Sequence, residues 1–423
     1  MKKIRVGLLG LGQVGSGVYR ILTKKAALLK AQTGVDLEIT KILVRNPDKK
    51  RLVSVPKRLL TTRPKDILQD PSIRIVVELV GGISPAESWH LEAFKNGKDV
   101  VTANKALLAE RGERLFNAAR KFHRQLFFEA SVGGGIPVIK SLREGLVANR
   151  IESLTGIVNG TSNYILTQMS RKKISFKTAL ELAQANGYAE ADPTFDIKGI
   201  DAAHKLAILI RLAFKRSAVF SKLKVRGIDS ISEFDIDYAK RFGYVIKLIA
   251  QAKQSGNKLL ARVEPLLLKE DHILAKVDGA FNALLFKGDE VGDFLLYGQG
   301  AGSRPTASAV VNDLCDLVQG RQSNFSAVGS AADLGTLKGP AARYYLRFSV
   351  VDRPGVLAEI AKHLGKEQVS IADVIQFERK VGNAIPLIMV THHSEEDAVE
   401  RAVHAIDKLA SVKAKSQKIR IED

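Results

Sequence analysis

Short apolar runs and amphipathic stretches alternate along the first 130 residues. The run Ile4–Leu9 predicts a buried strand, and a helical pattern follows it to about Lys30. The later strand-like runs are Leu37–Val44, Ile73–Val80, Asp99–Thr102 and Leu126–Ala130, and helical patterns between them include Ala86–Asn96 and Leu107–Phe122. Strands alternating with helices predict an α/β fold with a doubly wound parallel sheet and right-handed crossovers.

A glycine-rich turn joins the first strand to the first helix, with the sequence Gly10-Leu11-Gly12-Gln13-Val14-Gly15. In a G-x-G-x-x-G turn at this position, the first glycine permits the tight turn and the second lets the backbone approach a pyrophosphate. The third allows close packing of helix and strand. The free N–H groups of the helix N-terminus attract the phosphate. We therefore predict a Rossmann-type dinucleotide-binding domain over residues 1–130.

The loop after the second predicted strand bears on the choice of nucleotide. NAD-binding domains commonly place Asp or Glu there, whereas this chain has Arg45, with three more basic residues close behind. An arginine can pair with a 2′-phosphate, so NADP is favoured over NAD. The distance from Gly15 is about thirty residues rather than about twenty, and a solvated basic loop remains the alternative interpretation.

Two further regions follow the nucleotide domain. Residues 131–325 mix glycine-rich turns, strand-like segments and helices, which is typical of an α+β substrate-binding and dimerisation domain. The strand-like segments are Ser153–Val158, Leu259–Leu268 and Asn282–Lys287, and the helices include Phe176–Asn186 and Ala202–Leu212. A stretch rich in serine and glycine, residues 326–342, is predicted to be a linker.

The last 81 residues predict a small ferredoxin-like module. Residues 343–423 read as strand, helix, two strands, helix and strand, a βαββαβ order. The predicted elements are Tyr344–Val351, Val356–Leu364, Ser370–Glu378, Ala384–Thr391, Glu395–Leu409 and Lys413–Ile421.

The segment Gly187–Lys205 is the richest in candidate chemistry. Four carboxylates precede or open an apolar helix, and helix capping cannot use all of them. Asp201 and Lys205 share one helix face. Burial lowers the pKa of an ammonium group and a carboxylate opposes that shift, so such a lysine can exchange a proton near neutral pH. An ordinary surface ion pair is the alternative.

Two other segments are candidate binding sites. Lys105 follows a predicted strand, and ligands of doubly wound sheets collect beyond the carboxyl ends of strands; the alternative is a lysine that merely starts a helix. Glu129–Pro137 runs from a strand end into three glycines. Carbonyl oxygens in such a loop can coordinate a hard cation, although a tight connection explains the glycines equally well.

Composition excludes several classes of function. Lys and Arg number 65 against 45 Asp and Glu, a formal charge of +20, but only 6% of residues are aromatic. We therefore expect a generally basic surface and no specific nucleic-acid partner. The longest uncharged stretch, residues 153–170, is too polar to span a membrane. The single cysteine, Cys315, excludes an internal disulfide and a thiolate zinc cage and fits a reducing cytoplasm.

Together these motifs resemble the homoserine dehydrogenase family over residues 1 to about 325. The resemblance rests on the glycine-rich turn, Thr102–Lys105, Glu129–Pro137, Gly156–Leu166, Gly187–Lys205, Tyr297–Gly302 and Pro305-Thr306. Asp352–Leu357, at a predicted strand–helix turn, resembles an ACT domain. The resemblance implies interconversion of L-homoserine and L-aspartate 4-semialdehyde with a nicotinamide cofactor, in the biosynthesis of threonine, methionine and isoleucine.

The resemblance also implies roles for individual residues. Lys205 is the expected acid/base residue, Asp201 orients it or helps to relay the proton, and Lys105 lies beside substrate and nicotinamide and shares the proton chemistry. Other implied contacts are to the substrate ammonium group, from Glu190 with Asp196 nearby, and to the cofactor, from Gly187 and Gly302.

Further expectations concern an ion, assembly and control. A sodium ion is expected near Glu129, Val132, Gly134 and Ile136, largely through main-chain oxygens. Residues 305–325 are expected to pack back onto the nucleotide domain, and the chain to form a homodimer or homotetramer. The ACT-like module suggests feedback by threonine; a module used only for oligomerisation is the alternative.

Three other functions agree with parts of the sequence. Phosphoglycerate dehydrogenase also joins a dinucleotide domain to an ACT module, but it needs a mid-chain fingerprint and a catalytic histidine. A cofactor-binding sensor has no need of Lys105, Asp201 and Lys205 together. A nucleic-acid binder driven by charge would show sequence-specific, salt-dependent DNA binding.

Overall fold

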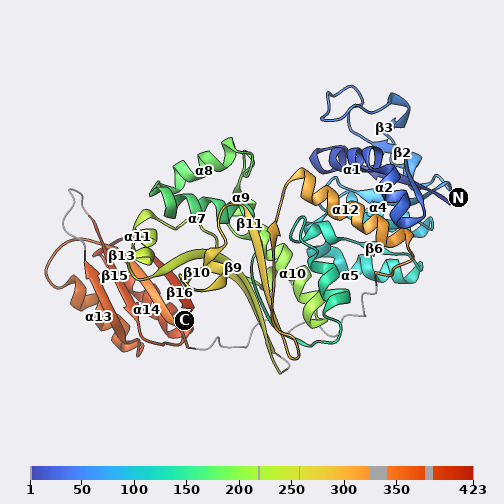
Figure 1. Ribbon diagram of the computed structural model, residues 1–423. Coiled ribbons are helices and arrows are strands. Elements are labelled where there is room, and N and C mark those ends of the chain that lie inside the picture. The colour runs from blue at the N-terminus through green and yellow to red at the C-terminus, as the bar shows by residue number, and fades with distance from the viewer. Residues whose placement is uncertain (1, 218–219, 257, 324–340, 377–383, 423) are drawn as a thin grey trace.

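The computed structural model describes residues 2–217, 220–256, 258–323, 341–376 and 384–422. Two β-sheets organise the chain, and Figure 1 shows the N-terminal domain at one end, the C-terminal module at the other and a central sheet between them. Among the described residues, no helix combines the length and the apolar character that crossing a membrane requires.

The N-terminal sheet is parallel and has six strands in the order β3-β2-β1-β4-β5-β6, which confirms the predicted doubly wound fold. The strands are β1 (Lys3–Leu9), β2 (Asp36–Leu43), β3 (Leu60–Thr61), β4 (Ile73–Glu78), β5 (Asp99–Thr102) and β6 (Leu126–Phe127). The strand order reverses between β1 and β4, and ligands of such sheets bind at this switch point.

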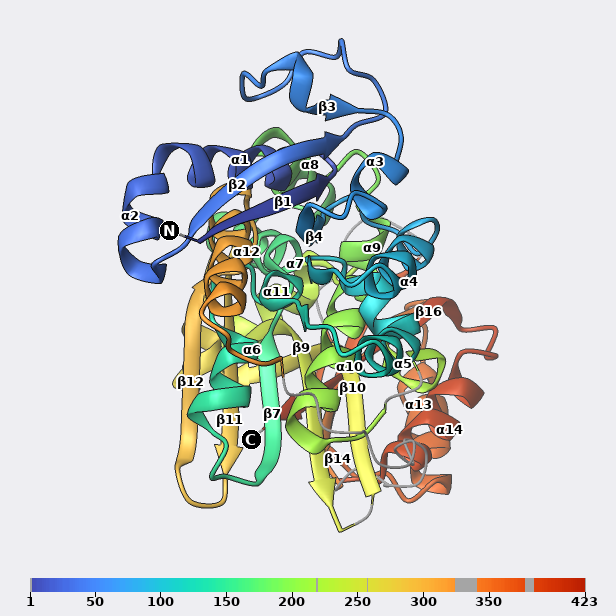
Figure 2. The same cartoon turned by 90° about the vertical axis from the view of Figure 1, so that its right-hand side faces the viewer.

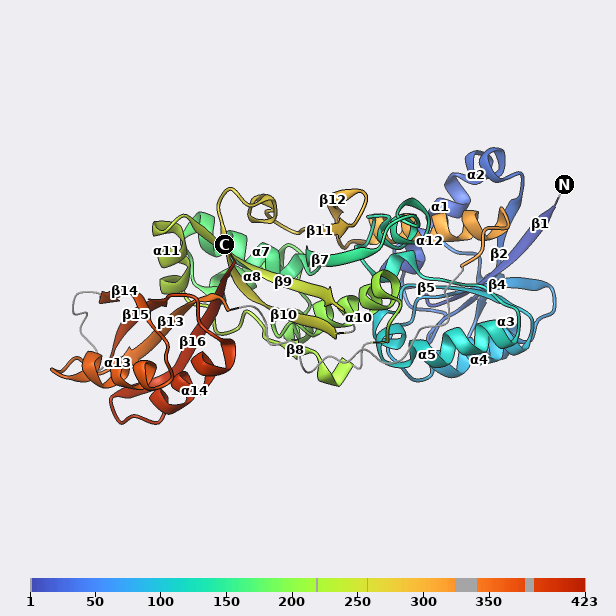
Figure 3. The same ribbon diagram turned by 90° about the horizontal axis from the view of Figure 1, so that it is seen from below.

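Helices cover both faces of this sheet. Figure 3 shows α1 (Gln13–Lys24), α2 (Ala26–Thr33) and α12 (Ser303–Val318) on one face, and α3 (Lys65–Leu68), α4 (Ala86–Lys95) and α5 (Lys105–Lys121) on the other. Helix α12 comes from far along the chain and lies beside α1 (Figure 2). The Ser303 hydroxyl donates to the Gln13 carbonyl oxygen at 2.6 Å. Residues after the central domain therefore complete the nucleotide domain.

The central domain contributes six of the ten strands of a second sheet. Its strands are β7 (Ile151–Ile157), β8 (Lys224–Val225), β9 (Tyr244–Ser255), β10 (Lys258–Lys269), β11 (Phe281–Gly288) and β12 (Gly292–Gln299). Its helices are α6 (Val138–Lys140), α7 (Gly160–Lys172), α8 (Phe176–Ala185), α9 (Thr194–Ile197), α10 (Ile200–Phe214) and α11 (Glu233–Arg241). Helix α10 is buried between this sheet and α5 of the nucleotide domain.

The C-terminal module has the predicted βαββαβ order. Its elements are β13 (Arg343–Val350), α13 (Val356–Lys366), β14 (Ile371–Gln376), β15 (Ile385–Thr391), α14 (Glu396–Ile406) and β16 (Val412–Glu422). Strand β16 pairs in parallel with β10, so one sheet runs in the order β12-β11-β7-β9-β10-β16-β13-β15-β14 through both regions. Most of the predicted linker, residues 326–340, lies outside the described residues, as do the last two residues of the predicted strand 370–378.

Two predicted elements differ from the structure for local reasons. The strand predicted over residues 126–130 ends at Phe127, and Glu129–Ser131 form a 3-10 turn. The backbone turns there because the Glu129 N–H donates to Asp313 at 2.8 Å rather than to a neighbouring strand. The helical pattern to Lys30 is interrupted at Lys25, where the backbone leaves the helical region (φ −112°, ψ 19°) and separates α1 from α2.

Candidate active site

A groove of about 1030 Å³ opens at the switch point between β1 and β4. Four residues of the glycine-rich turn line it: Gly10, Leu11, Gly12 and Gln13. Gly12 is the N-cap of α1, so the first free N–H groups of that helix lie at the groove. Val14 and Gly15 belong to the first turn of α1 and are not among the described lining residues.

Basic residues line the groove beyond the end of β2. Arg45 follows β2, and Lys49, Lys50 and Arg51 complete the cluster. The Arg51 guanidinium is already committed to its own loop, because it donates to the carbonyl oxygens of Pro47 at 2.8 Å and Lys49 at 2.7 Å. Arg45 and the two lysines are therefore the cations of this cluster available to a phosphate.

A buried carboxylate at the end of β4 positions Lys105. Glu78 accepts hydrogen bonds from the Thr102 hydroxyl at 2.8 Å and from the Asn104 amide at 3.3 Å. Asn104 in turn caps α5, its Oδ1 accepting from the Leu107 N–H at 3.1 Å. Because Lys105 is the first residue of that helix, its backbone is held on both sides. Asn104 lies in the Thr102–Lys105 motif but has no role predicted from the sequence, and Glu78 is predicted only as part of a strand.

Lys105, Asp201 and Lys205 meet at one carboxylate, although Lys105 belongs to the other domain. Lys105 Nζ lies 2.6 Å from Asp201 Oδ1, and Lys205 Nζ lies 2.7 Å from Asp201 Oδ2. Lys205 also donates to the Val158 carbonyl oxygen at 2.7 Å. The side chains of Asp201 and Lys205 are 5% and 9% exposed, against 43% for Lys105. Only Lys105 is thus broadly open to solvent.

A second amide supports this cluster. Asn159, which caps α7, donates from Nδ2 to Asp201 Oδ2 at 2.8 Å and to Asp196 Oδ1 at 2.7 Å. It holds two carboxylates together that would otherwise repel each other. Asn159 lies in the Gly156–Leu166 motif without a predicted role of its own; its position between a strand and a helix is the typical N-cap position.

The electrostatics of the three groups differ. Burial by itself would raise the pKa of Asp201, but the ammonium groups of Lys205 and Lys105 hold it below its ordinary value. The Asp201 carboxylate raises the pKa of Lys105. Burial lowers the pKa of Lys205 despite the opposing effect of Asp201. Lys205 is therefore the amine of this cluster that releases its proton more readily.

Two of the other predicted contact residues, Glu190 and Asp196, act electrostatically on this centre. Glu190 is exposed, and its charge helps to raise the pKa of Lys105. Gly187 lies in an exposed turn after α8, and Gly302 immediately precedes α12, whose first residue contacts the glycine-rich turn. Burial, with the nearby Asp201, raises the pKa of Asp196.

Most of the triple-glycine loop is buried, although Gly135 and Pro137 are exposed. The Glu129 carboxylate accepts hydrogen bonds from the N–H groups of Ile139 and Lys140, both at 2.8 Å. Val132, Gly134 and Ile136 are buried in the loop that follows. Among the described residues, no group of three or more His, Cys, Asp or Glu side chains is arranged to hold a metal ion.

Comparison with known protein families accounts for each region of the chain. The family described as "Homoserine dehydrogenase, NAD binding domain" matches residues 10–129, "Homoserine dehydrogenase" matches residues 137–315, and "ACT domain" matches residues 344–408. The homoserine dehydrogenase of Pseudomonas aeruginosa is 41% identical, and that of Bacillus subtilis is 40% identical. Each alignment covers 100% of this chain and 99% of the relative.

Comparison with solved structures indicates the same family. A homoserine dehydrogenase from Thiobacillus denitrificans matches with a TM-score of 0.88 and 44% identity, covering 100% of this chain and 99% of that one. A hyperthermophilic archaeal homoserine dehydrogenase in complex with NADPH matches with a TM-score of 0.63 and 27% identity over 74% of this chain and 97% of that one. This chain belongs to the homoserine dehydrogenase family, NAD(P)-dependent oxidoreductases that act on a CH–OH group, and it carries a C-terminal ACT domain.

Proposed function

We propose that Lys205 is the acid/base residue in the interconversion of L-homoserine and L-aspartate 4-semialdehyde. The alcohol proton is too weakly acidic to leave unaided at neutral pH, so its removal accompanies hydride transfer to the nicotinamide. In oxidation the neutral amine accepts this proton. In reduction the ammonium form returns it to the developing alkoxide. The observation that carries the proposal is the shared Asp201 carboxylate between the two lysines.

The two lysines divide the work according to their surroundings. Lys205 is buried and has the lowered pKa, which suits a group that changes protonation state. Lys105 is more exposed and has the raised pKa, so it stays charged and orients the reacting oxygen beside the nicotinamide. Asp201 binds both ammonium groups and keeps their separation fixed during the reaction.

The substrate's own ammonium group needs an acidic partner. Glu190 supplies it at the open side of the site, with Asp196 nearby. In the nucleotide groove, Arg45, Lys49 and Lys50 favour NADP over NAD. These cations line the groove, and none of its described lining residues is a carboxylate that would bind the ribose hydroxyl of NAD. We propose that Gly187 and Gly302 contact the same cofactor.

The residues of the triple-glycine loop fit a bound sodium ion. Main-chain oxygens of Glu129, Val132, Gly134 and Ile136 are hard donors, as a monovalent cation requires. An adjacent orphaned group supports a polar site: Asn282 is fully buried, and neither Oδ1 nor Nδ2 has a hydrogen-bond partner. A Cβ on Gly134 would lie 2.6 Å from the Gly300 carbonyl oxygen, so this loop must keep glycine to stay packed.

Threonine is the proposed effector of the ACT domain, and the structure contains a contact route for its action. Glu400 of α14 pairs with Lys224 and Arg226, each at 2.8 Å. Arg226 belongs to a segment that contacts residues near the candidate active site. Two residues after it, Ile228 donates its N–H to the Ile197 carbonyl oxygen at 2.7 Å.

The fit at that contact is close. A Cβ at position 227 would lie 2.1 Å from the Ile197 carbonyl oxygen, so only glycine lets the two backbones approach this far. Ile197 lies between Asp196 and Asp201. A shift of α14 therefore has a direct mechanical path to the carboxylates of the site, which is what coupling between distant sites requires.

We propose a homodimer or homotetramer as the working assembly. Edge strand β12 and its neighbour β11 expose stacked aromatic rings, Phe281 and Tyr297, with centroids 5.2 Å apart. Exposed aromatic side chains on an edge strand are candidates for burial against a second copy. Sedimentation equilibrium measures the mass directly, and a single-chain mass at micromolar concentration would contradict this assembly.

The mechanism is tested by the structure of the full chain with NADP⁺ and homoserine bound. We expect the homoserine hydroxyl oxygen within hydrogen-bond reach of Lys205 Nζ, with Lys105 Nζ on the same oxygen or on the nicotinamide side. A hydroxyl oxygen out of reach of both amines would reject the assignment.

A further inference from the structure

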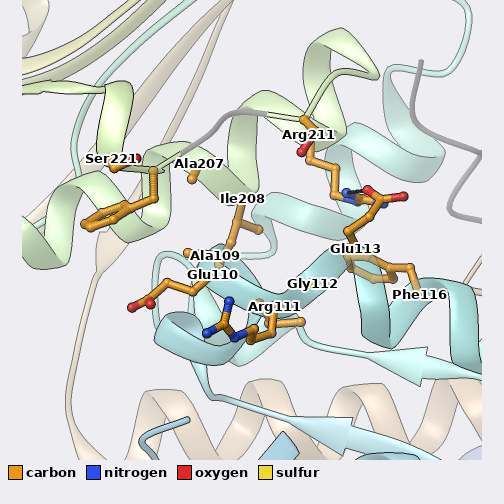
Figure 4. A pocket seen from close by; sticks show the side chains of 13 residues that line it. Ala109, Glu110, Arg111, Gly112, Glu113, Phe116, Ala207, Ile208, Arg211 and Ser221 are labelled. Atoms are coloured by element: carbon orange, nitrogen blue, oxygen red, sulfur yellow. Dashed lines mark hydrogen bonds and ion pairs between the residues drawn. The ribbon is translucent and has the colours of Figure 1, made fainter. Parts of the chain in front are cut away.

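A second cavity lies between helices α5 and α10 (Figure 4). Its volume is about 350 Å³, at the lower end of the range for small-molecule pockets. Helix α5 forms one wall and α10 another, and residues after α10, including Phe220 and Ser221, form a third. None of the described residues that line it also lines the nucleotide groove.

Part of the lining is apolar. Leu108 of α5 and Ala207 and Ile208 of α10 are all buried among the packed helices. This surface favours a ligand with a small hydrocarbon group rather than one that is polar throughout.

The charged part of the lining is balanced. Glu110 and Arg111 are neighbours on α5 and both are exposed, whereas Arg211 is 10% exposed and pairs with Glu113 at 2.8 Å. Figure 4 shows Glu110 and Arg111 toward one end of the cavity and the Arg211–Glu113 pair toward the other. The Arg211 guanidinium also lies over the Phe116 ring, 4.4 Å from its centroid. This contact holds the Arg211 side chain in place at its end of the cavity.

This balance restricts the ligand's chemistry. A polyanion would meet Glu110 and Glu113, and a polycation would meet the two arginines, so each would be partly repelled. A carboxylate beside an ammonium group matches the adjacent Arg111 and Glu110, since each charge then has an opposite partner.

We propose that this cavity binds a small zwitterion, an α-amino acid with an apolar side chain. Its carboxylate contacts Arg111, its ammonium group contacts Glu110, and its side chain packs on Leu108 and Ile208. The proposal is independent of threonine binding at the ACT domain and of homoserine binding at the catalytic cluster.

The cavity's position makes it an effector site. Helix α5 begins at Lys105 and α10 contains Asp201, and the ion pair between these residues joins the two helices at the active-site end. Glu110 also lies 3.4 Å from His204, the residue before Lys205. A ligand that contacts both helices therefore constrains the separation on which the catalytic cluster depends, and its binding is linked to turnover.

The direct test uses L-valine as the probe and the full chain labelled at isoleucine methyl groups. The Ile208 methyl resonance is assigned with Ile208→Val. We expect L-valine to shift it saturably, whereas isobutyrate and isobutylamine, which each carry one charge, leave it in place at equal concentration. An unmoved resonance with L-valine, or equal shifts with a singly charged probe, would overturn the proposal.

Variants of Arg111 and Glu110 test whether these side chains bind the charged groups of L-valine. We expect Arg111→Gln and Glu110→Gln each to weaken L-valine binding at this resonance at least tenfold. Arg114→Gln is the matched control, because Arg114 lies on the same helix, pairs with Glu87 at 2.9 Å and does not line the cavity. If both cavity variants bind L-valine as tightly as the parent chain does, the site is rejected. Binding of L-valine elsewhere on the chain would be equally strong in the cavity variants and in Arg114→Gln.

Discussion

The ammonium group of Lys105 and the carboxylate of Asp201 lie 2.6 Å apart, across the boundary between two domains. Each residue is fixed by its own element, Lys105 by the start of α5 and Asp201 by the first turn of α10. The ion pair therefore forms only when the nucleotide domain and the central domain pack against each other. The proposed catalytic cluster is therefore assembled by the packing of the two domains.

Replacing Lys205 tests the proton-transfer step. Lys205→Ala removes the proposed acid/base group, so we expect homoserine oxidation to fall about 10²–10⁴-fold, the usual contribution of such a group. Binding of NADPH and of the semialdehyde should persist, as measured by fluorescence titration and by KM. Lys198→Ala is the control, because Lys198 is exposed and pairs at 3.5 Å with Asp229. Near-normal turnover in purified Lys205→Ala would reject the role.

Asp201→Asn tests the electrostatic part of the mechanism through pH. Asp201 raises the pKa of Lys105 and opposes the lowering of the Lys205 pKa by burial. Without this carboxylate both amines lose their protons at lower pH. Oxidation requires a neutral amine, so the rising limb of kcat/KM against pH should move toward acid while the maximal rate falls. A limb that stays in place would show that Asp201 does not set the protonation of the lysines.

Part of this site follows from local sequence patterns. Asp201 and Lys205 are one helical turn apart, so their contact follows from a helix over that segment. The glycine-rich turn after a buried strand likewise indicates a nucleotide site. These features need no knowledge of tertiary structure.

The rest depends on contacts between distant segments. Glu78, Asn104 and Asn159 act through partners elsewhere in the chain, and nothing in their local sequence distinguishes them from ordinary strand-end and capping residues. The return of α12 to the nucleotide domain and the pairing of β16 with β10 are similar cases, because helix and strand periodicity does not specify a partner.

Arg45→Ala tests the preference for NADP. A hydrogen bond to a charged group contributes about 1.5–3 kcal/mol, so we expect KM for NADP to rise about 10- to 100-fold while KM for NAD changes little. Arg63→Ala controls for loss of surface charge, because Arg63 pairs with Asp66 at 3.0 Å and does not line the groove. Equal effects on both nucleotides would place the 2′-phosphate elsewhere.

Sodium binding is tested by thermal unfolding in sodium chloride and in choline chloride of equal ionic strength. A ligand that binds only the folded chain at ten times Kd stabilises it by about 1.4 kcal/mol, so Tm should be higher in sodium. Gly134→Ala should abolish the difference, because its Cβ would meet the Gly300 backbone. Gly145→Ala is the matched control, since a Cβ there meets nothing within 4 Å. Identical Tm values in the two salts would argue against the ion.

Glu396→Gln tests the junction between the ACT domain and the catalytic region. The Glu396 carboxylate contacts Lys224, Arg262 and Lys418. Burial opposes ionisation, but these cations lower the pKa of Glu396 to about 2. The ionised Glu396 carboxylate therefore stabilises the folded chain at pH values above 4.5, the pKa of this group in the unfolded chain. This stabilisation is lost as the pH falls toward 2.

We expect Glu396→Gln to lower the free energy of unfolding by about 1–3 kcal/mol at neutral pH, with a smaller difference from the parent chain below pH 4.5. Urea titrations at several pH values measure this. Inhibition by threonine should weaken severalfold while activity without threonine persists, because the route from α14 to the Ile197 segment is loosened. Asp397→Asn is the control, being exposed on the same helix. Full threonine sensitivity in Glu396→Gln would show that the effector acts by another route.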